Sequence, residues 1–316
     1  MAGVSRFGEF SGKPTLSRLA LASVVGNVLI VGTGGAVRLT KSGLGCPTWP
    51  RCTDESYVTT AEMGLHGMIE FGNRLLTFVL AAVVIAGVIA AWQQRPARRG
   101  LRLLSVGAAF GIPAQAVIGG ITVLTDLNPW VVGLHFLASM AVIAAAYAFW
   151  RRTLGSDGPA QPTVPTPLRT LARLTAVVTA AVLVVGTWVT GSGPHSGDSG
   201  AARNGLDPES ISQVHADTVF LLLGLSVAIW FAFRAVSAPP AAIRAAGLLI
   251  LAELGQGVIG FVQYLTGLPV ALVGAHMLGS CLVWLAALAV LWSTRERTAA
   301  ATLPPTPTDT RQLERV

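Results

Sequence analysis

The sequence has few charged residues and few cysteines, and each shortage excludes a class of protein. Only 12% of the 316 residues are charged, whereas a typical soluble domain carries about 25%. Hydrophobic residues make up 52% of the chain and its mean hydropathy is +0.62, so an ordinary soluble protein is excluded and an integral membrane protein is indicated. Three cysteines are too few for the disulfide framework of a small secreted domain.

The net charge of +7 could suggest a nucleic-acid partner, but the basic residues are not clustered as such a surface requires. They lie between apolar runs, on alternate connections, which is how membrane topology is set. We therefore expect membrane lipid around the chain and no nucleic acid.

Eight apolar segments are each near the roughly 20 residues that a bilayer-spanning helix needs. Five of the 22 lysines and arginines lie on one side of the predicted membrane, and the rest lie on the other side. This bias predicts a multi-pass protein of the cell (plasma) membrane with both termini cytoplasmic. The predicted segments are 16–37, 67–92, 101–124, 130–150, 168–190, 211–233, 243–265 and 270–293.

An internal repeat sets the expected architecture. Gln115–Ser139 returns as Gln256–Ser280 after a shift of 141 residues, without a gap. The fold class predicted is therefore all-α and integral to the membrane, with two four-helix bundles related by a pseudo-two-fold axis along the membrane normal. The expected parts are a cytoplasmic N-terminal segment (1–15), a first unit (16–150), a cytoplasmic linker (151–167), a second unit (168–293) and a disordered cytoplasmic tail (294–316).

Polar and ionisable groups inside a bilayer cost several kcal/mol or need partners, so each is a functional candidate. Within the predicted spans they are Glu70, Asn73, Arg74, His135, His215, Asp217, Glu253, Gln256 and His276, with His66 at the outer end of its segment. His135 and His276 occupy equivalent positions in the two repeats. Two histidines on facing helices suit the axial positions of a heme iron, and packed, hydrogen-bonded histidines are the alternative.

The two units differ at the position that His215 occupies in the second unit. A shift of 142 residues aligns Asn73 with His215 and Glu70 with the neutral Ser212. The second unit therefore resembles a complete bis-His cofactor site. The first unit resembles an open site in which the carboxylate of Glu70 lies one helical turn before Asn73, on the same face. A reaction centre would need such a nearby carboxylate. Arg74 beside it suggests either a heme propionate as partner or a structural ion pair with Glu70.

Two cysteines lie close together in the first external loop, on the oxidising side of the predicted membrane. Cys46 and Cys52 could form a disulfide, stay free, or contribute to a zinc site. The disulfide is favoured, because it persists in an oxidising environment and because a second pair of zinc ligands is missing from the sequence pattern.

Taken together, these motifs resemble the heme A synthase family over nearly the whole chain. They are GLGCPTWPRC around the cysteine pair, IEFGNRLLTF around Glu70, QVHA at His215, and the repeated segments that end in LH and AH. The resemblance implies oxidation of the C8 methyl group of heme O to the formyl group of heme A, for cytochrome c oxidase assembly. It also implies a cofactor heme b between His215 and His276, Glu70 as the catalytic residue, and His135, Asn73 and Arg74 at the substrate heme.

The sequence departs from the family pattern at position 73, where Asn73 stands in place of the histidine of E-x-x-H-R. His66, two turns earlier on the same face, could compensate. The resemblance implies heme O synthase and the oxidase assembly machinery as partners, an electron donor that the sequence does not identify, and a possible homo-oligomer. The rival functions are a non-catalytic bis-His cytochrome b that passes electrons from quinol to a partner, and a transporter.

Overall fold

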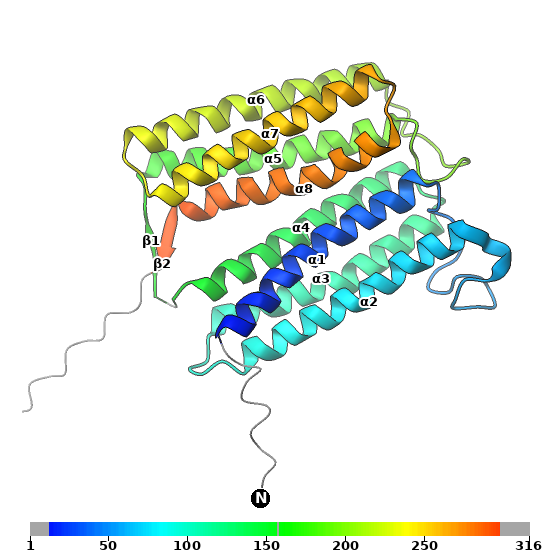
Figure 1. The fold of residues 1–316 in the computed structure, drawn as a ribbon, viewed down its shortest axis with the longest axis horizontal. Coiled ribbons are helices and arrows are strands. Elements are labelled where there is room, and N and C mark those ends of the chain that lie inside the picture. The colour runs from blue at the N-terminus through cyan, green and yellow to red at the C-terminus, as the bar shows by residue number, and fades with distance from the viewer. Residues whose placement is uncertain (1–12, 157, 298–316) are drawn as a thin grey trace, which may run out of the picture.

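The computed structural model describes residues 13–156 and 158–297, and within them eight helices are long and apolar enough to cross a membrane (Figure 1). All eight predicted spans are confirmed, and most of the helices extend a few residues beyond them. The helices are α1 (Lys13–Leu39), α2 (Gly64–Trp92), α3 (Arg99–Leu124), α4 (Pro129–Leu154), α5 (Thr166–Ser192), α6 (Pro208–Ala235), α7 (Pro240–Leu265) and α8 (Val270–Ser293), and a short 3-10 helix, η2 (Ala61–Met63), precedes α2.

The helices form two four-helix units. In the first, α1 packs against α2 and α4, and α3 packs against both of those helices; α5 to α8 repeat this arrangement. α2 and α4 are therefore diagonal partners across the first unit, and α6 and α8 are diagonal partners across the second. Contacts of α1 and α4 with α8, and of α4 with α5, join the two units, which Figure 1 shows one above the other. The predicted pair of four-helix bundles is confirmed.

The surfaces of the two units also agree with a membrane protein. Leu265, Phe78 and Phe110 are 78%, 73% and 72% exposed, although they are large apolar side chains that a soluble domain would bury. Between the units, Val31, Met140, Ile143, Leu183 and Cys281 form a buried cluster, with residues from all four inner helices. Cys281 is a free, buried cysteine, as expected for a packing residue.

Polar caps fix the starts of the two helices that carry His135 and His215. The Asn128 side chain accepts a hydrogen bond from the Trp130 amide at the start of α4, and Asp207 accepts one from the Ser210 amide at the start of α6. Hydrogen bonds from the side chain and then the backbone of Ser210 lower the pKa of Asp207. Each helix then continues with a proline in its first turn, where the missing N–H costs nothing.

One small sheet corrects the start of the predicted tail. β1 (Ala160–Pro162), within the predicted linker, pairs antiparallel with β2 (Arg295–Arg297), so the tail residues that the structure describes are not disordered. The Thr163 hydroxyl donates to the Ser293 carbonyl beside this pair. α4 also continues to Leu154, and α1 begins at Lys13. The expectations for residues 1–12 and 298–316 lie outside the described residues.

Candidate functional site

Three histidines point into the helical units, and each lies against a glycine of the preceding helix. A Cβ on Gly119 would meet the His135 ring at 3.1 Å, one on Gly186 would meet His215 at 3.3 Å, and one on Gly260 would meet His276 at 3.5 Å. The absence of a side chain at these glycines therefore leaves room for the imidazoles.

The same three rings each have an unsatisfied nitrogen. Nδ1 of His135, His215 and His276 is buried and has no hydrogen-bond partner within the part of the chain that the structure describes. Buried polar side-chain atoms are normally hydrogen-bonded, so a purely structural histidine would be expected to have a partner. The arrangement fits residues that bind a group from outside the chain.

The second unit brings His215 and His276 together across its interior. They come from the diagonal helices α6 and α8, and their rings lie against Gly186 of α5 and Gly260 of α7. A pair of histidines on opposite sides of a bundle can take the two axial positions of a heme iron. The residues present therefore fit the predicted cofactor.

In the first unit, α2, the diagonal partner of the helix that carries His135, has Asn73 at the position that His215 occupies in the second unit. The Asn73 side-chain oxygen accepts a hydrogen bond of 2.7 Å from the Thr33 hydroxyl of α1, and its amide nitrogen lies 3.9 Å from the place of a Cβ on Gly34. An amide is a poor ligand for heme iron. The first unit therefore offers one histidine, His135, and no second histidine on the diagonal helix at this level among the described residues.

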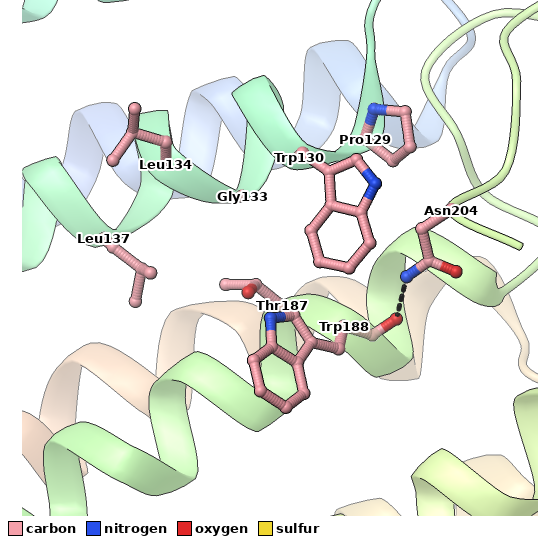
Figure 2. Close-up of a pocket in the computed structure, with 8 residues that line it drawn as sticks. All are labelled: Pro129, Trp130, Gly133, Leu134, Leu137, Thr187, Trp188 and Asn204. Carbon is pink, nitrogen blue, oxygen red and sulfur yellow. Dashed lines mark hydrogen bonds between the residues drawn. The ribbon is translucent and has the colours of Figure 1, made fainter. Parts of the chain in front are cut away.

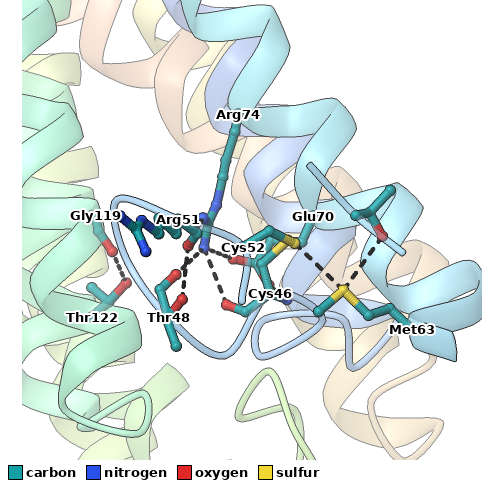
Figure 3. Close-up of polar contacts among 10 residues, drawn as sticks. Cys46, Thr48, Arg51, Cys52, Met63, Glu70, Arg74, Gly119 and Thr122 are labelled. Carbon is teal, nitrogen blue, oxygen red and sulfur yellow. Dashed lines mark hydrogen bonds and ion pairs between the residues drawn. A yellow bond between two sulfur atoms is a disulfide. The ribbon is translucent and has the colours of Figure 1, made fainter. Parts of the chain in front are cut away.

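Glu70 and the partly buried Arg74 form a polar centre under the loop between α1 and α2, which the sequence predicts to be external (Figure 3). Glu70 is only 6% exposed, its Oε1 accepts from Arg74 Nη2 at 2.6 Å, and its Oε2 accepts from the Cys46 amide at 2.6 Å. Arg74 also donates to the carbonyls of Cys46, Thr48 and Arg51. The structural ion pair, one of the two alternatives for Arg74, is therefore present, and both residues hold the loop in place.

The external loop is closed by the predicted disulfide. Cys46 and Cys52 are bonded, and neither is exposed to solvent. The loop also contacts α3, because the Trp49 indole occupies the place where a side chain on Gly120 would be. The disulfide, the Glu70–Arg74 pair and Trp49 together fix this loop over the outer end of the first unit.

Removing the disulfide is expected to loosen this loop. A double Cys46→Ser, Cys52→Ser variant loses a constraint of about 2 kcal/mol on a loop this short, which corresponds to roughly a thirtyfold larger opened fraction. Trypsin cleavage after the exposed Arg51 should accelerate accordingly. Cys281→Ser, which removes the buried cysteine between the units, is the control and should leave the rate unchanged. Equal cleavage rates in the double variant and the parent would contradict a role of the disulfide in holding the loop.

His66 does not replace the missing histidine. Its side chain lies near the outer end of α2, where Nδ1 is 2.9 Å from the Ser42 hydroxyl, and the residue is exposed. The bond fastens α2 to the external loop instead of directing the ring toward His135. The compensation considered from the sequence is therefore not supported by this geometry.

A small cavity of about 110 Å³ lies between the two units, near the start of α4 and the end of α5 (Figure 2). Its lining comes from α4, α5 and the loop before α6, and none of the predicted site residues is part of it. Gly133, which lines it, is two residues before His135, and Thr187, also in the lining, follows Gly186. The cavity therefore lies between the two units, near His135 along α4 and near Gly186 along α5.

Sequence reasoning missed the partners that position the site. Gly119 and Gly260 align in the internal repeat, and that signal could have identified them as the surfaces against which His135 and His276 lie. Thr33 and the carbonyls that Arg74 holds gave no comparable signal, because their contacts depend on how distant segments pack.

The fold and the site define a class: an all-α membrane protein of two helical units, with one inward-facing histidine in the first and a pair suited to a bound cofactor in the second. Residues 17–195, more than half of the chain, match the family model described as cytochrome oxidase assembly protein, and the chain belongs to this family.

Individual relatives agree with this assignment. The chain is 34% identical to the heme A synthase of Lysinibacillus sphaericus over 131 residues, which cover 41% of this chain and 42% of that protein. It is 31% identical to the heme A synthase of Alkalihalophilus pseudofirmus over 132 residues, 40% of this chain and 44% of that protein. These matches span less than half of either relative. The heme A synthase of Rhizorhabdus wittichii is 26% identical over 323 aligned positions, 84% of this chain and 88% of that protein.

Proposed function

We propose that this protein is a heme A synthase, an oxidoreductase that converts the C8 methyl group of heme O to the formyl group of heme A for cytochrome c oxidase. The observation that carries the proposal is the difference between the two units. The second has a complete histidine pair, His215 and His276, whereas the first combines His135 with Asn73 and the buried carboxyl group of Glu70. The names of the relatives support the same activity.

In this proposal the second unit holds a heme b as cofactor. His215 and His276 would bind its iron from opposite sides, and Gly186 and Gly260 leave the space that the two rings need. The heme b would supply one-electron redox chemistry when bound. The protein's contribution is to fix the two ligands and to exclude water with the surrounding apolar side chains.

The first unit would bind the substrate heme O, with His135 as its axial ligand and Glu70 as the acid–base group. A carboxyl group can exchange a proton with a reacting centre when it is held within hydrogen-bond reach, and the contacts with Arg74 and the Cys46 amide fix where Glu70 lies. Contacts of Arg74 and Asn73 with the substrate heme stay predictions.

Replacing Asn73 with His is expected to strengthen substrate binding. The new imidazole would face His135 from the diagonal helix α2 and supply the second axial ligand that the first unit lacks, so the first-unit iron becomes six-coordinate. Activity should be retained, because the family pattern has histidine at this position. Absorbance titration with heme O should show tighter binding and a new low-spin signal; Asn73→Gln, which supplies no imidazole, is the control. An Asn73→His variant with unchanged affinity would place residue 73 outside the substrate site.

Expression together with a heme O synthase tests the activity itself. The proposal predicts that mass analysis of the extracted hemes finds heme A in addition to heme b. Heme b alone, in a protein that binds it normally, would instead indicate the non-catalytic cytochrome. The same proposal places the protein in the plasma membrane with both termini cytoplasmic, between a heme O synthase that supplies its substrate and the oxidase assembly that uses its product.

A further inference from the structure

A second buried carboxyl group lies in the second unit, away from the residues already described. Glu253 of α7 is 5% exposed and Ser226 of α6 is fully buried. The Ser226 hydroxyl donates a hydrogen bond of 2.7 Å to Glu253 Oε1. Oε2 is buried and has no hydrogen-bond partner among the residues that the structure describes. One acceptor site of this carboxyl group is therefore available for a proton.

The fold itself does not require a carboxyl group here. The two repeat shifts place Ile112 of α3 where Glu253 stands and Val84 of α2 where Ser226 stands. In the first unit, Ile112 and Val84 pack together in an apolar cluster with Leu80. Because a carboxyl group near the middle of a spanning helix is costly to keep, its presence in one repeat only suggests a use that belongs to the second unit.

Glu253 shares a face of α7 with residues that lead to the histidine pair. Gln256 and Gly260 follow it by three and seven residues, which are neighbouring positions on one helix face. Gly260 contacts His276 and lies about 10 Å along the helix from Glu253. Between them, the Gln256 amide packs against Gly279 of α8 and its oxygen has no partner within the described ranges. Polar groups therefore extend from Glu253 toward His276.

On the side of Glu253 away from the histidines, buried apolar side chains leave no polar route along α6 and α7. Leu249, Ile229, Phe233 and Ala246 are all 0% exposed and belong to one apolar cluster. They lie on α6 and α7 between the Ser226–Glu253 pair and the helix ends farther from the histidines. A proton that reaches Glu253 would therefore come from the histidine side of the unit.

Among the residues that the structure describes, no neighbouring cation neutralises Glu253. The titratable and charged side chains on the helices that pack against α7 are Glu209, His215, Asp217 and Arg234 of α6 and His276 and Cys281 of α8. Glu209 and Arg234 lie at the ends of α6, Asp217 is exposed, and Cys281 packs between the units. On α7 itself, Arg244 and Tyr264 are more than two turns away. The charge that Glu253 would experience most directly is that of a group held by His215 and His276.

We propose that Glu253 is a proton-binding residue of the second-unit cofactor pocket. This inference rests on the proposed binding of a heme between His215 and His276. The core of a ferric bis-His heme carries one positive charge, which a carboxylate in a low-dielectric interior can compensate. If a one-electron reductant removed this charge, Glu253 would take up one proton from bulk solvent and form an O–H bond at Oε2, so that one proton would be bound for each electron. Glu253 releases that proton on reoxidation.

Redox titration of the full-length, heme-loaded protein with dithionite at several pH values tests the proposal. One proton bound per electron changes the reduction equilibrium tenfold per pH unit, which is 59 mV for a one-electron couple. We expect the wild-type second-unit heme to approach this slope and Glu253→Gln to lose most of it. Asp217→Asn, which removes an exposed carboxylate of α6, should keep the slope. A double Ser226→Val, Glu253→Ile variant introduces the apolar pair of the first unit and should bind heme without pH dependence.

The outcomes separate this inference from the proposed function. Wild-type protein without a second-unit heme would overturn both. A heme whose potential does not change with pH, or a slope that survives in Glu253→Gln or is lost in Asp217→Asn, would overturn only the role of Glu253. Infrared difference spectra of the wild type need no variant: a carboxylic acid C=O band should appear on reduction, and its absence would also overturn the proposal.

Discussion

Replacing Glu70 with Gln is expected to lower the formation of heme A at least about a hundredfold, which is the lower end of what a general acid–base group contributes. Gln has nearly the size of Glu and keeps an oxygen that can accept the Cys46 amide hydrogen bond, but it cannot exchange a proton at neutral pH. The second-unit heme b should stay bound, because His215 and His276 lie in the other bundle. Heme A yield and the absorbance spectrum of the purified variant measure the two effects.

The structural role of Glu70 needs its own control, since the substitution also breaks the ion pair with Arg74. Arg74→Gln breaks the same pair but leaves the carboxyl group in place. If Glu70 acts on the reacting centre, Glu70→Gln should be at least about tenfold less active than Arg74→Gln. Equal losses in the two variants would mean that the carboxylate acts only by holding the external loop.

Replacing His276 or His215 with Ala is expected to remove the low-spin heme b signal almost completely. Each substitution leaves the iron with one axial ligand in an apolar bundle, and nothing else among the described residues offers a second histidine there. A change that leaves a larger cavity adds a positive test: His276→Gly with free imidazole in solution should regain the low-spin spectrum, which a merely structural histidine would not do. A normal spectrum in His276→Ala would contradict the assignment of the second unit.

Much of the fold could be predicted because its determinants are local. The length and apolarity of each span set the eight helices, and the alignment of His135 with His276 indicated two similar units. The Cys46–Cys52 bond was also predictable, since a short spacing on the predicted oxidising side of the membrane favours it. These features depend on residues that are close in sequence or repeated at a fixed interval.

The parts that could not be predicted depend on contacts between distant segments. No pattern in the sequence shows that the Cys46 amide donates a hydrogen bond to Glu70. None shows that Arg74 donates hydrogen bonds to three loop carbonyls. Glu253 was recognisable as a polar residue in an apolar segment, but its partner Ser226 lies on another helix. The β1–β2 pair was missed for the same reason, because a Pro-rich linker and a charged tail gave no sign of pairing with each other.

The central claim is that the two units hold different hemes for different purposes. Mass analysis of the hemes bound to His135→Ala and His276→Ala, each purified from cells that also contain a heme O synthase, tests this division most directly. The account predicts that His135→Ala retains heme b and loses bound heme O and heme A. His276→Ala is expected to lose heme b before it loses heme O or heme A. Loss of the same heme from both variants would contradict it.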